Sequence, residues 1–122
     1  MAVSEYLDSL TDYAVECLRI SEEHGFYCPD AITGELPYDL VRDGSISLVD
    51  LTLSKLALVH SEVSEMVEAA REGNYKLFAE EMADVFIRLF HMAGAMDIDI
   101  EGEIRAKMEK NEARPYKHGK LA

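Results

Sequence analysis

The chain has 122 residues, with 24 Asp or Glu against 12 Lys or Arg, which gives a formal charge of −12. That length suits a single domain over 1–122, and a hydrophobic share of 48% with 30% charged residues excludes a disordered polar chain. The acidic balance argues against a nucleic-acid polymer as a partner, because most of the surface would repel a phosphate backbone.

The first predicted helix spans about residues 4–24, with Ser4 as its N-cap and Gly25 as a natural stop. The stretch that follows, about 25–46, collects Gly and Pro among polar residues, which predicts a long loop. Loops of this length are uncommon in small domains and often cover or bind a ligand.

Three further helices are predicted, each opened by a side chain that can cap it. They span about 48–71 after Ser47, about 75–96 after Asn74, and about 100–111 after Asp99. No strand-like alternation competes with them, so the predicted fold class is all-α. The helix over 75–96 is apolar on nearly every side, and in a chain of this size we expect a second subunit to help bury it.

The cellular setting is predicted from what the sequence lacks. Cys17 and Cys28 are too few for a disulfide framework, which favours a reducing compartment. The N-terminus carries acidic residues early, without the apolar core of a signal peptide, and no run of about 18 apolar residues occurs. We therefore expect a cytoplasmic protein that has no membrane partner.

Two acid pairs fall on the apolar sides of consecutive helices. On a helical wheel, Glu62 lies inside the apolar arc of the second helix, with Glu65 at its edge. Glu81 lies inside the apolar stripe of the third helix, with Asp84 at its edge. Four carboxylates in one interior would repel each other unless protonated or balanced by cations. Hard oxygen ligands suit Mg²⁺ or Mn²⁺, so the pattern predicts a metal site.

Other interpretations of the acid pairs stay open. An acid pair at this spacing is most often a solvated helix face. Arg88 follows Asp84 by four residues and Glu81 by seven, so it could simply neutralise both. A di-iron bundle would need Glu-x-x-His motifs, which neither pair provides. His60 and His91 are interpreted as core or interface histidines.

The C-terminal segment is basic. Residues 105–122 hold six basic and two acidic residues, a net charge of +4 that leaves −16 on residues 1–104. Lys107 and Asn111 share a face with Ile100 and Ile104, so we expect that face to turn inward. A basic tail alone is usually solvated, but an acidic metal cage beside a basic segment suits a polyphosphate ligand.

The segments HSEVSEMVEA, EEMADVFIRL and KMEKNEARPYKHGK resemble the MazG-like nucleotide pyrophosphohydrolases of the all-α NTP pyrophosphatase superfamily. The ExxE, the 15-residue spacer (66–80) and the ExxD correspond to the metal motif of that family, and the last segment to its phosphate-side signature. The resemblance covers about 48–120. It implies a four-to-five-helix bundle completed by oligomerisation, as a homodimer at least or as a tetramer.

The resemblance also implies an activity, the Mg²⁺-dependent hydrolysis of a (d)NTP to a (d)NMP and pyrophosphate, with Mn²⁺ as a substitute metal. Carried over residue by residue, it assigns metal binding to Glu62, Glu65, Glu81 and Asp84, and phosphate binding to Lys107, Asn111, Arg114 and, as weaker transfers in the tail over 112–122, Lys117 and Lys120.

We expect water activated by the metal to attack a phosphorus in line, with pyrophosphate leaving. Glu62 is the candidate catalytic base, because it is the more buried member of its pair and burial raises a carboxyl pKa. Phe26, Tyr27 and Tyr38 in the long loop form a candidate base pocket, although loop aromatics more often pack as plugs.

Two alternative functions remain. One is a non-catalytic helical oligomer that binds a nucleotide or a protein partner, with the acids engaged by Arg88 and Lys107. The other, within the same superfamily, is a phosphoribosyl-ATP pyrophosphohydrolase.

Overall fold

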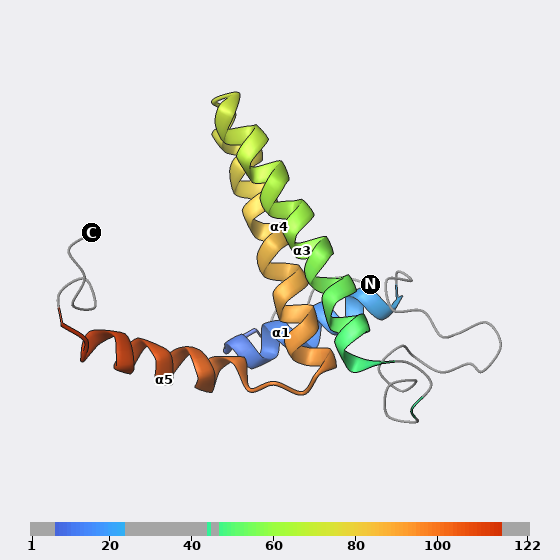
Figure 1. Cartoon of the computed structure of the whole chain (residues 1–122), viewed down its shortest axis with the longest axis vertical. Helices are drawn as coiled ribbons and strands as arrows, with labels where there is room; N and C mark the ends of the chain where they lie inside the picture. The colour runs from blue at the N-terminus through green and yellow to red at the C-terminus, as the bar shows by residue number, and fades with distance from the viewer. Residues whose placement is uncertain (1–6, 24–43, 45–46, 116–122) are drawn as a thin grey trace.

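The computed structural model describes residues 7–23, 44 and 47–115, and every regular element in these ranges is an α-helix. Labelled as in Figure 1, the helices are α1 (Leu10–Glu23), α3 (Leu48–Arg71), α4 (Tyr75–Ala95) and α5 (Ile100–Glu112). The predicted all-α class is confirmed. None of these described helices combines the length and apolar character needed to cross a membrane.

The helices α3, α4 and α5 begin at the predicted N-caps, Ser47, Asn74 and Asp99. In each case the side-chain oxygen of the cap accepts a hydrogen bond from the backbone amide three residues on, at 3.4, 3.1 and 3.1 Å respectively. These bonds satisfy amides that have no acceptor inside the helix, which is why the caps fix the helix starts.

The predicted start of the first helix is wrong. Residues 7–9 are not helical, and α1 begins at Leu10. Ser9 and Asp12 form a reciprocal capping box, in which the Asp12 amide donates to Ser9 Oγ at 3.1 Å and the Ser9 amide to Asp12 Oδ2 at 3.2 Å. The expected cap, Ser4, lies outside the described residues.

A tight reversal joins α3 to α4. The amide of Gly73 donates to the carbonyl of Ala70 at 3.1 Å, and the amide of Asn74 donates to the carbonyl of Ala69 at 3.0 Å. This is a Schellman motif, which places Gly73 at a φ of +70°, a conformation that glycine adopts without a steric penalty. The two helices therefore run back along each other as a long antiparallel hairpin (Figure 1).

The small core lies where α1 crosses α4, near the end of the hairpin opposite its turn (Figure 1). Ala14 of α1 and Ala93 of α4 are only 2% and 4% exposed. A Cβ added to Gly94 would lie 2.7 Å from the carbonyl oxygen of Ala14, so the close approach of the two helices requires glycine there.

Much apolar surface remains exposed in the single chain. On α3 a set of exposed apolar side chains is spaced by three, four or seven residues, so they form one stripe along the helix. They are Val49, Leu53, Leu56, Val63 and Val67. On α4, Phe86 and Ile87 are 54% and 47% exposed. As expected, one chain alone therefore does not bury this helix on every side, because α1 and α3 pack on only part of it. That a second subunit covers the rest stays a prediction.

Candidate metal centre

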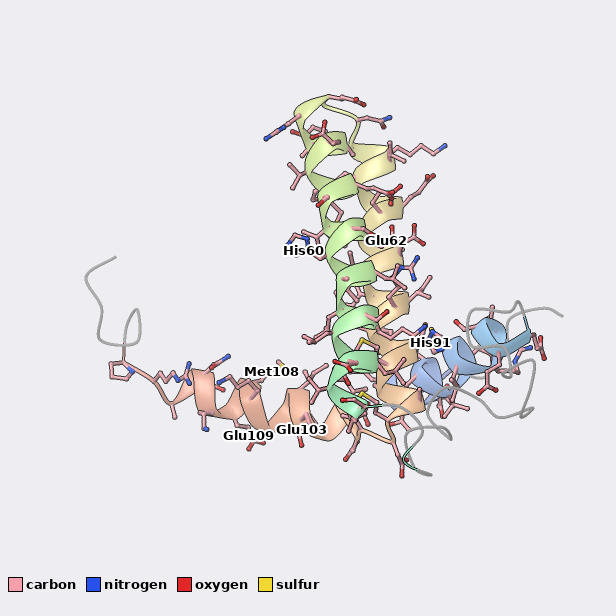
Figure 2. All side chains as sticks on the ribbon, turned by 45° about the vertical axis from the view of Figure 1, so that its right-hand side comes forward. His60, Glu62, His91, Glu103, Met108 and Glu109 are labelled. Atoms are coloured by element: carbon pink, nitrogen blue, oxygen red, sulfur yellow. The ribbon has the colours of Figure 1, made fainter. Side chains whose placement is uncertain are left out.

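Three carboxylates meet across the middle of the α3/α4 hairpin. Glu62 comes from α3, and Glu81 and Asp84 come from α4, where their spacing puts them on one side of the helix. One oxygen from each of the three lies within 4.8 Å of the others. Figure 2 shows Glu62 on the α4 side of α3 and His60 on the opposite side. His60 is exposed, which excludes a core position within one chain, whereas its position at an interface stays a prediction.

Glu81 is the most perturbed of these acids. Its Oε2 atom is buried and has no hydrogen-bond partner among the described residues. The nearby carboxylate of Glu65 is the largest cause that raises the pKa of Glu81, followed by burial, and Glu62 and Asp84 add to them, so that the pKa reaches about 7. The cluster thus holds more negative charge than the protein around it balances, and in the absence of a cation Glu81 is partly protonated at neutral pH.

Arg88 forms an ion pair with Glu62, and not with Asp84 or Glu81 as the sequence suggested. Its Nε donates a hydrogen bond of 2.9 Å to Oε1 of Glu62, across the hairpin. The side chains of Glu62 and Arg88 are 12% and 29% exposed, so water screens the pair only in part. Within the described part of the chain, Arg88 forms no ion pair with Glu81 or Asp84, the acids on its own helix.

A pocket of about 240 Å³ opens beside the cluster, at its α1 side. Among the described residues, its lining consists of Ile20, Ser21, Glu62, Asp84, Ile87, Arg88 and His91. His91 is 6% exposed, which confirms its interpretation as a core histidine. Burial, followed by the positive charges of Lys55 and Arg88, lowers the pKa of His91 to about 4, so the imidazole is neutral near pH 7.

The sequence interpretation missed His91 as a wall of this pocket. The signal was present, because Asp84, Arg88 and His91 follow one another at steps of four and three residues and so share one face of α4. Ser21, by contrast, could not be assigned to the pocket before the crossing of α1 and α4 was known.

A second, shallower groove of about 430 Å³ lies toward the hairpin turn. Glu65 and Glu81 line it together with Glu68 and Glu72. Glu65 and Glu68 are exposed, and Glu68 pairs with Arg71 at 3.2 Å. The acidic cluster therefore stands between two openings, one walled by Arg88 and His91 and the other by glutamates together with Ser64, Ala69 and Leu77.

The predicted phosphate-binding residues do not meet the cluster within one chain. Lys107, Asn111 and Arg114 are exposed, and α5 contacts α1 while it projects away from the hairpin (Figures 1 and 2). The expectation that the Lys107 face turns inward is wrong here, because α5 buries no residue and has too little apolar surface to fold back. The other predicted site residues, Lys117, Lys120, Phe26, Tyr27 and Tyr38, lie outside the described residues.

The clustered residues fit a divalent cation. Their donors are all carboxylate oxygens, the ligand type that Mg²⁺, Mn²⁺ and Ca²⁺ prefer. Oxygens on opposite sides of such an ion stand roughly 4–5 Å apart, close to the 4.8 Å that contains the three donors. A cation would also satisfy the buried Oε2 atom of Glu81, which no protein donor among the described residues contacts.

Comparison with known protein families shows which family the sequence matches. The sequence model of the MazG-like family matches residues 53–121, more than half of the chain. The matched segment contains the three clustered carboxylates, Glu65 and Arg88. No curated protein and no solved structure matches the chain.

Proposed function

Because this chain belongs to the MazG-like family, we propose that it is a Mg²⁺-dependent nucleoside triphosphate pyrophosphohydrolase. It would convert a (d)NTP to a (d)NMP and pyrophosphate, as cytoplasmic housekeeping of the nucleotide pool. The observation that carries the proposal is the cluster of Glu62, Glu81 and Asp84, with a Glu81 oxygen that is buried and accepts no hydrogen bond from the described residues. Such a site is stabilised by a divalent cation, and Mg²⁺ commonly accompanies substrate phosphates.

In this proposal Glu62, Glu65, Glu81 and Asp84 hold the metal. A divalent cation bound there would stabilise the negative charge of the phosphate oxygens and would make water a better nucleophile. Glu62 is the proposed general base, since it is 12% exposed and lies on the wall of the α1-side pocket, where a substrate can reach it. The neutral imidazole of His91 forms part of the same wall and can hydrogen-bond a ligand without adding charge.

Lys107, Asn111 and Arg114 are the proposed phosphate-side residues, with Lys117 and Lys120 in the tail. Since α5 projects away from the hairpin of its own chain, we propose that they act in a site completed by a second copy. The exposed apolar stripe on α3 supports a homodimer at least, because its steps of four and three residues match the seam of a helix pair. Residues 1–122 would form one domain of that assembly.

The direct test is a panel of canonical and modified nucleotides with Mg²⁺, in which released pyrophosphate is measured. Wild type should release pyrophosphate, and Glu62→Gln and Asp84→Asn should lower the rate by about 10²-fold or more. Glu68→Gln is the matched control, because Glu68 is exposed and pairs with Arg71 outside the cluster. Wild-type inactivity on the whole panel, or equal losses in the control, would refute the proposal.

A second candidate is a non-catalytic helical oligomer that binds a nucleotide or a protein, and the ion pair between Arg88 and Glu62 favours it. It predicts that Mg²⁺ leaves the melting temperature unchanged, whereas the enzyme proposal predicts a rise that saturates with the ion. Adding phosphoribosyl-ATP to the substrate panel separates the third candidate, an enzyme of the same superfamily with that substrate.

A further inference from the structure

Arg88 stands at the boundary between the acidic cluster and the α1-side pocket. It reaches across the hairpin to Glu62, one of the three clustered carboxylates, and it lines the pocket with Ile20 and Ile87. The two isoleucines give this wall an apolar character, and ions beside apolar walls are less screened by water than ions on an open surface.

The guanidinium of Arg88 is only partly used. An arginine carries five N–H donors in a planar fork. Only Nε donates, to Glu62, whereas Nη1 and Nη2 make no hydrogen bond to the described residues. The remaining donors are suited to the oxygens of a phosphate, which arginine binds through two parallel hydrogen bonds.

A cation at the cluster would compete with Arg88 for the carboxylate of Glu62. Both would use the negative charge of Glu62, and two positive charges placed that close repel. Cation binding therefore weakens the hold of Glu62 on Arg88. The released guanidinium remains beside the pocket, because the Arg88 backbone is fixed within α4.

We propose that Arg88 is an anion-binding residue that Glu62 holds until a divalent cation binds, after which its guanidinium binds a phosphate or diphosphate group in the α1-side pocket. This inference rests on the proposed function, because it requires the metal at the carboxylate cluster. It makes Arg88 a ligand-binding residue and not a permanent salt-bridge partner.

The proposal predicts effects of opposite sign from one substitution. Arg88→Met keeps much of the side-chain length and removes the charge and the donors. The Arg88→Met protein should bind Mg²⁺ alone roughly tenfold more tightly than wild type, because the cation no longer competes with the guanidinium for Glu62. It should bind inorganic pyrophosphate, added at saturating Mg²⁺, roughly tenfold or more weakly, because the fork is lost. A purely structural ion pair gives no such opposition.

The experiment is isothermal titration calorimetry on the full chain, first with Mg²⁺ and then with pyrophosphate at a fixed free Mg²⁺ concentration. Arg71→Met is the matched control, since it also removes an ion-paired arginine from the hairpin but leaves the cluster untouched. Its two affinities should stay near those of wild type. Arg88→Lys guards against misfolding of the Met variant, because it keeps the charge and loses the fork; it should weaken only pyrophosphate binding.

Three results overturn the inference. If Arg88→Met leaves both affinities unchanged, or weakens both, Arg88 serves only the fold. If wild type binds Mg²⁺ but not pyrophosphate, the inference fails while the metal site stands. If wild type binds no divalent cation, the proposed function fails as well, so the two failures are distinguishable.

Discussion

The contact of α1 with α4 at Gly94 can be tested by one added methyl group. In Gly94→Ala the new Cβ would lie 2.7 Å from the carbonyl oxygen of Ala14, whereas ordinary contact begins at 3.4 Å. The helices must therefore separate by about 0.7 Å, because the obstacle is backbone and cannot change rotamer. Since α1 carries Ile20 and Ser21, this displacement also reshapes the pocket beside the acidic cluster.

Two opposing contributions determine how much Gly94→Ala lowers the free energy of unfolding. Overpacking of this kind costs about 2–3 kcal/mol, and replacing glycine by alanine inside a helix returns about 1 kcal/mol. The net loss is about 1–2 kcal/mol. With an unfolding entropy of about 0.26 kcal/mol/K for a chain of this length, the melting temperature should fall by about 4–8 °C.

The assay is thermal unfolding followed by circular dichroism at one protomer concentration, in metal-free buffer. Ala79→Gly is the control, because Ala79 is exposed on the same helix and this reverse substitution measures helix propensity alone, about 4 °C of destabilisation. If Gly94→Ala instead raises the melting temperature by that amount, only propensity is acting. The close packing of α1 on α4 would then be refuted.

Three more outcomes follow from the structure. The raised pKa of Glu81 means that, in metal-free protein, its stabilising proton is fully bound below pH 4.5 and is lost as the pH rises through about 7. The rise in melting temperature caused by Mg²⁺ should therefore grow between about pH 6 and 8, and Glu81→Gln should abolish that growth. Leu53→Glu should reduce the mass measured by light scattering to that of a monomer, and Ser54→Glu on the next face should not. Asp97→Gly should raise the melting temperature by about 2–4 °C, because Asp97 has a φ of 57°, and Asp97→Ala should lower it.

The sequence predicted best what depends on neighbours along the chain. The starts of α3, α4 and α5 follow from Ser47, Asn74 and Asp99, whose side chains bond amides only three residues away. The start of α1 was missed because the prediction placed its cap at Ser4, whereas the cap is Ser9. The pattern Ser-x-x-Asp at 9–12 was the better signal, since both members of the pair can cap.

What depends on helix register or on a partner could not be predicted in this way. The helical wheel put Arg88 near Glu81 and Asp84, but Arg88 bonds Glu62, and only the register of the hairpin decides which side chains face each other across it. The wheel likewise gave α5 a common face for Lys107 and Asn111. A face turns inward only if something packs on it, and no described part of this chain covers that face.

The thin core explains why the charges at the cluster have large consequences. Ala69 is the only buried residue on α3, so the hairpin has little apolar burial with which to offset repulsion among the carboxylates. The ion pair with Arg88 neutralises the charge of Glu62. The buried oxygen of Glu81 still has no hydrogen-bond donor among the described residues. A cation at the cluster would neutralise the carboxylate charge that Arg88 does not neutralise. The same ion then makes the arginine available to an anion, so that metal binding and substrate binding would favour each other.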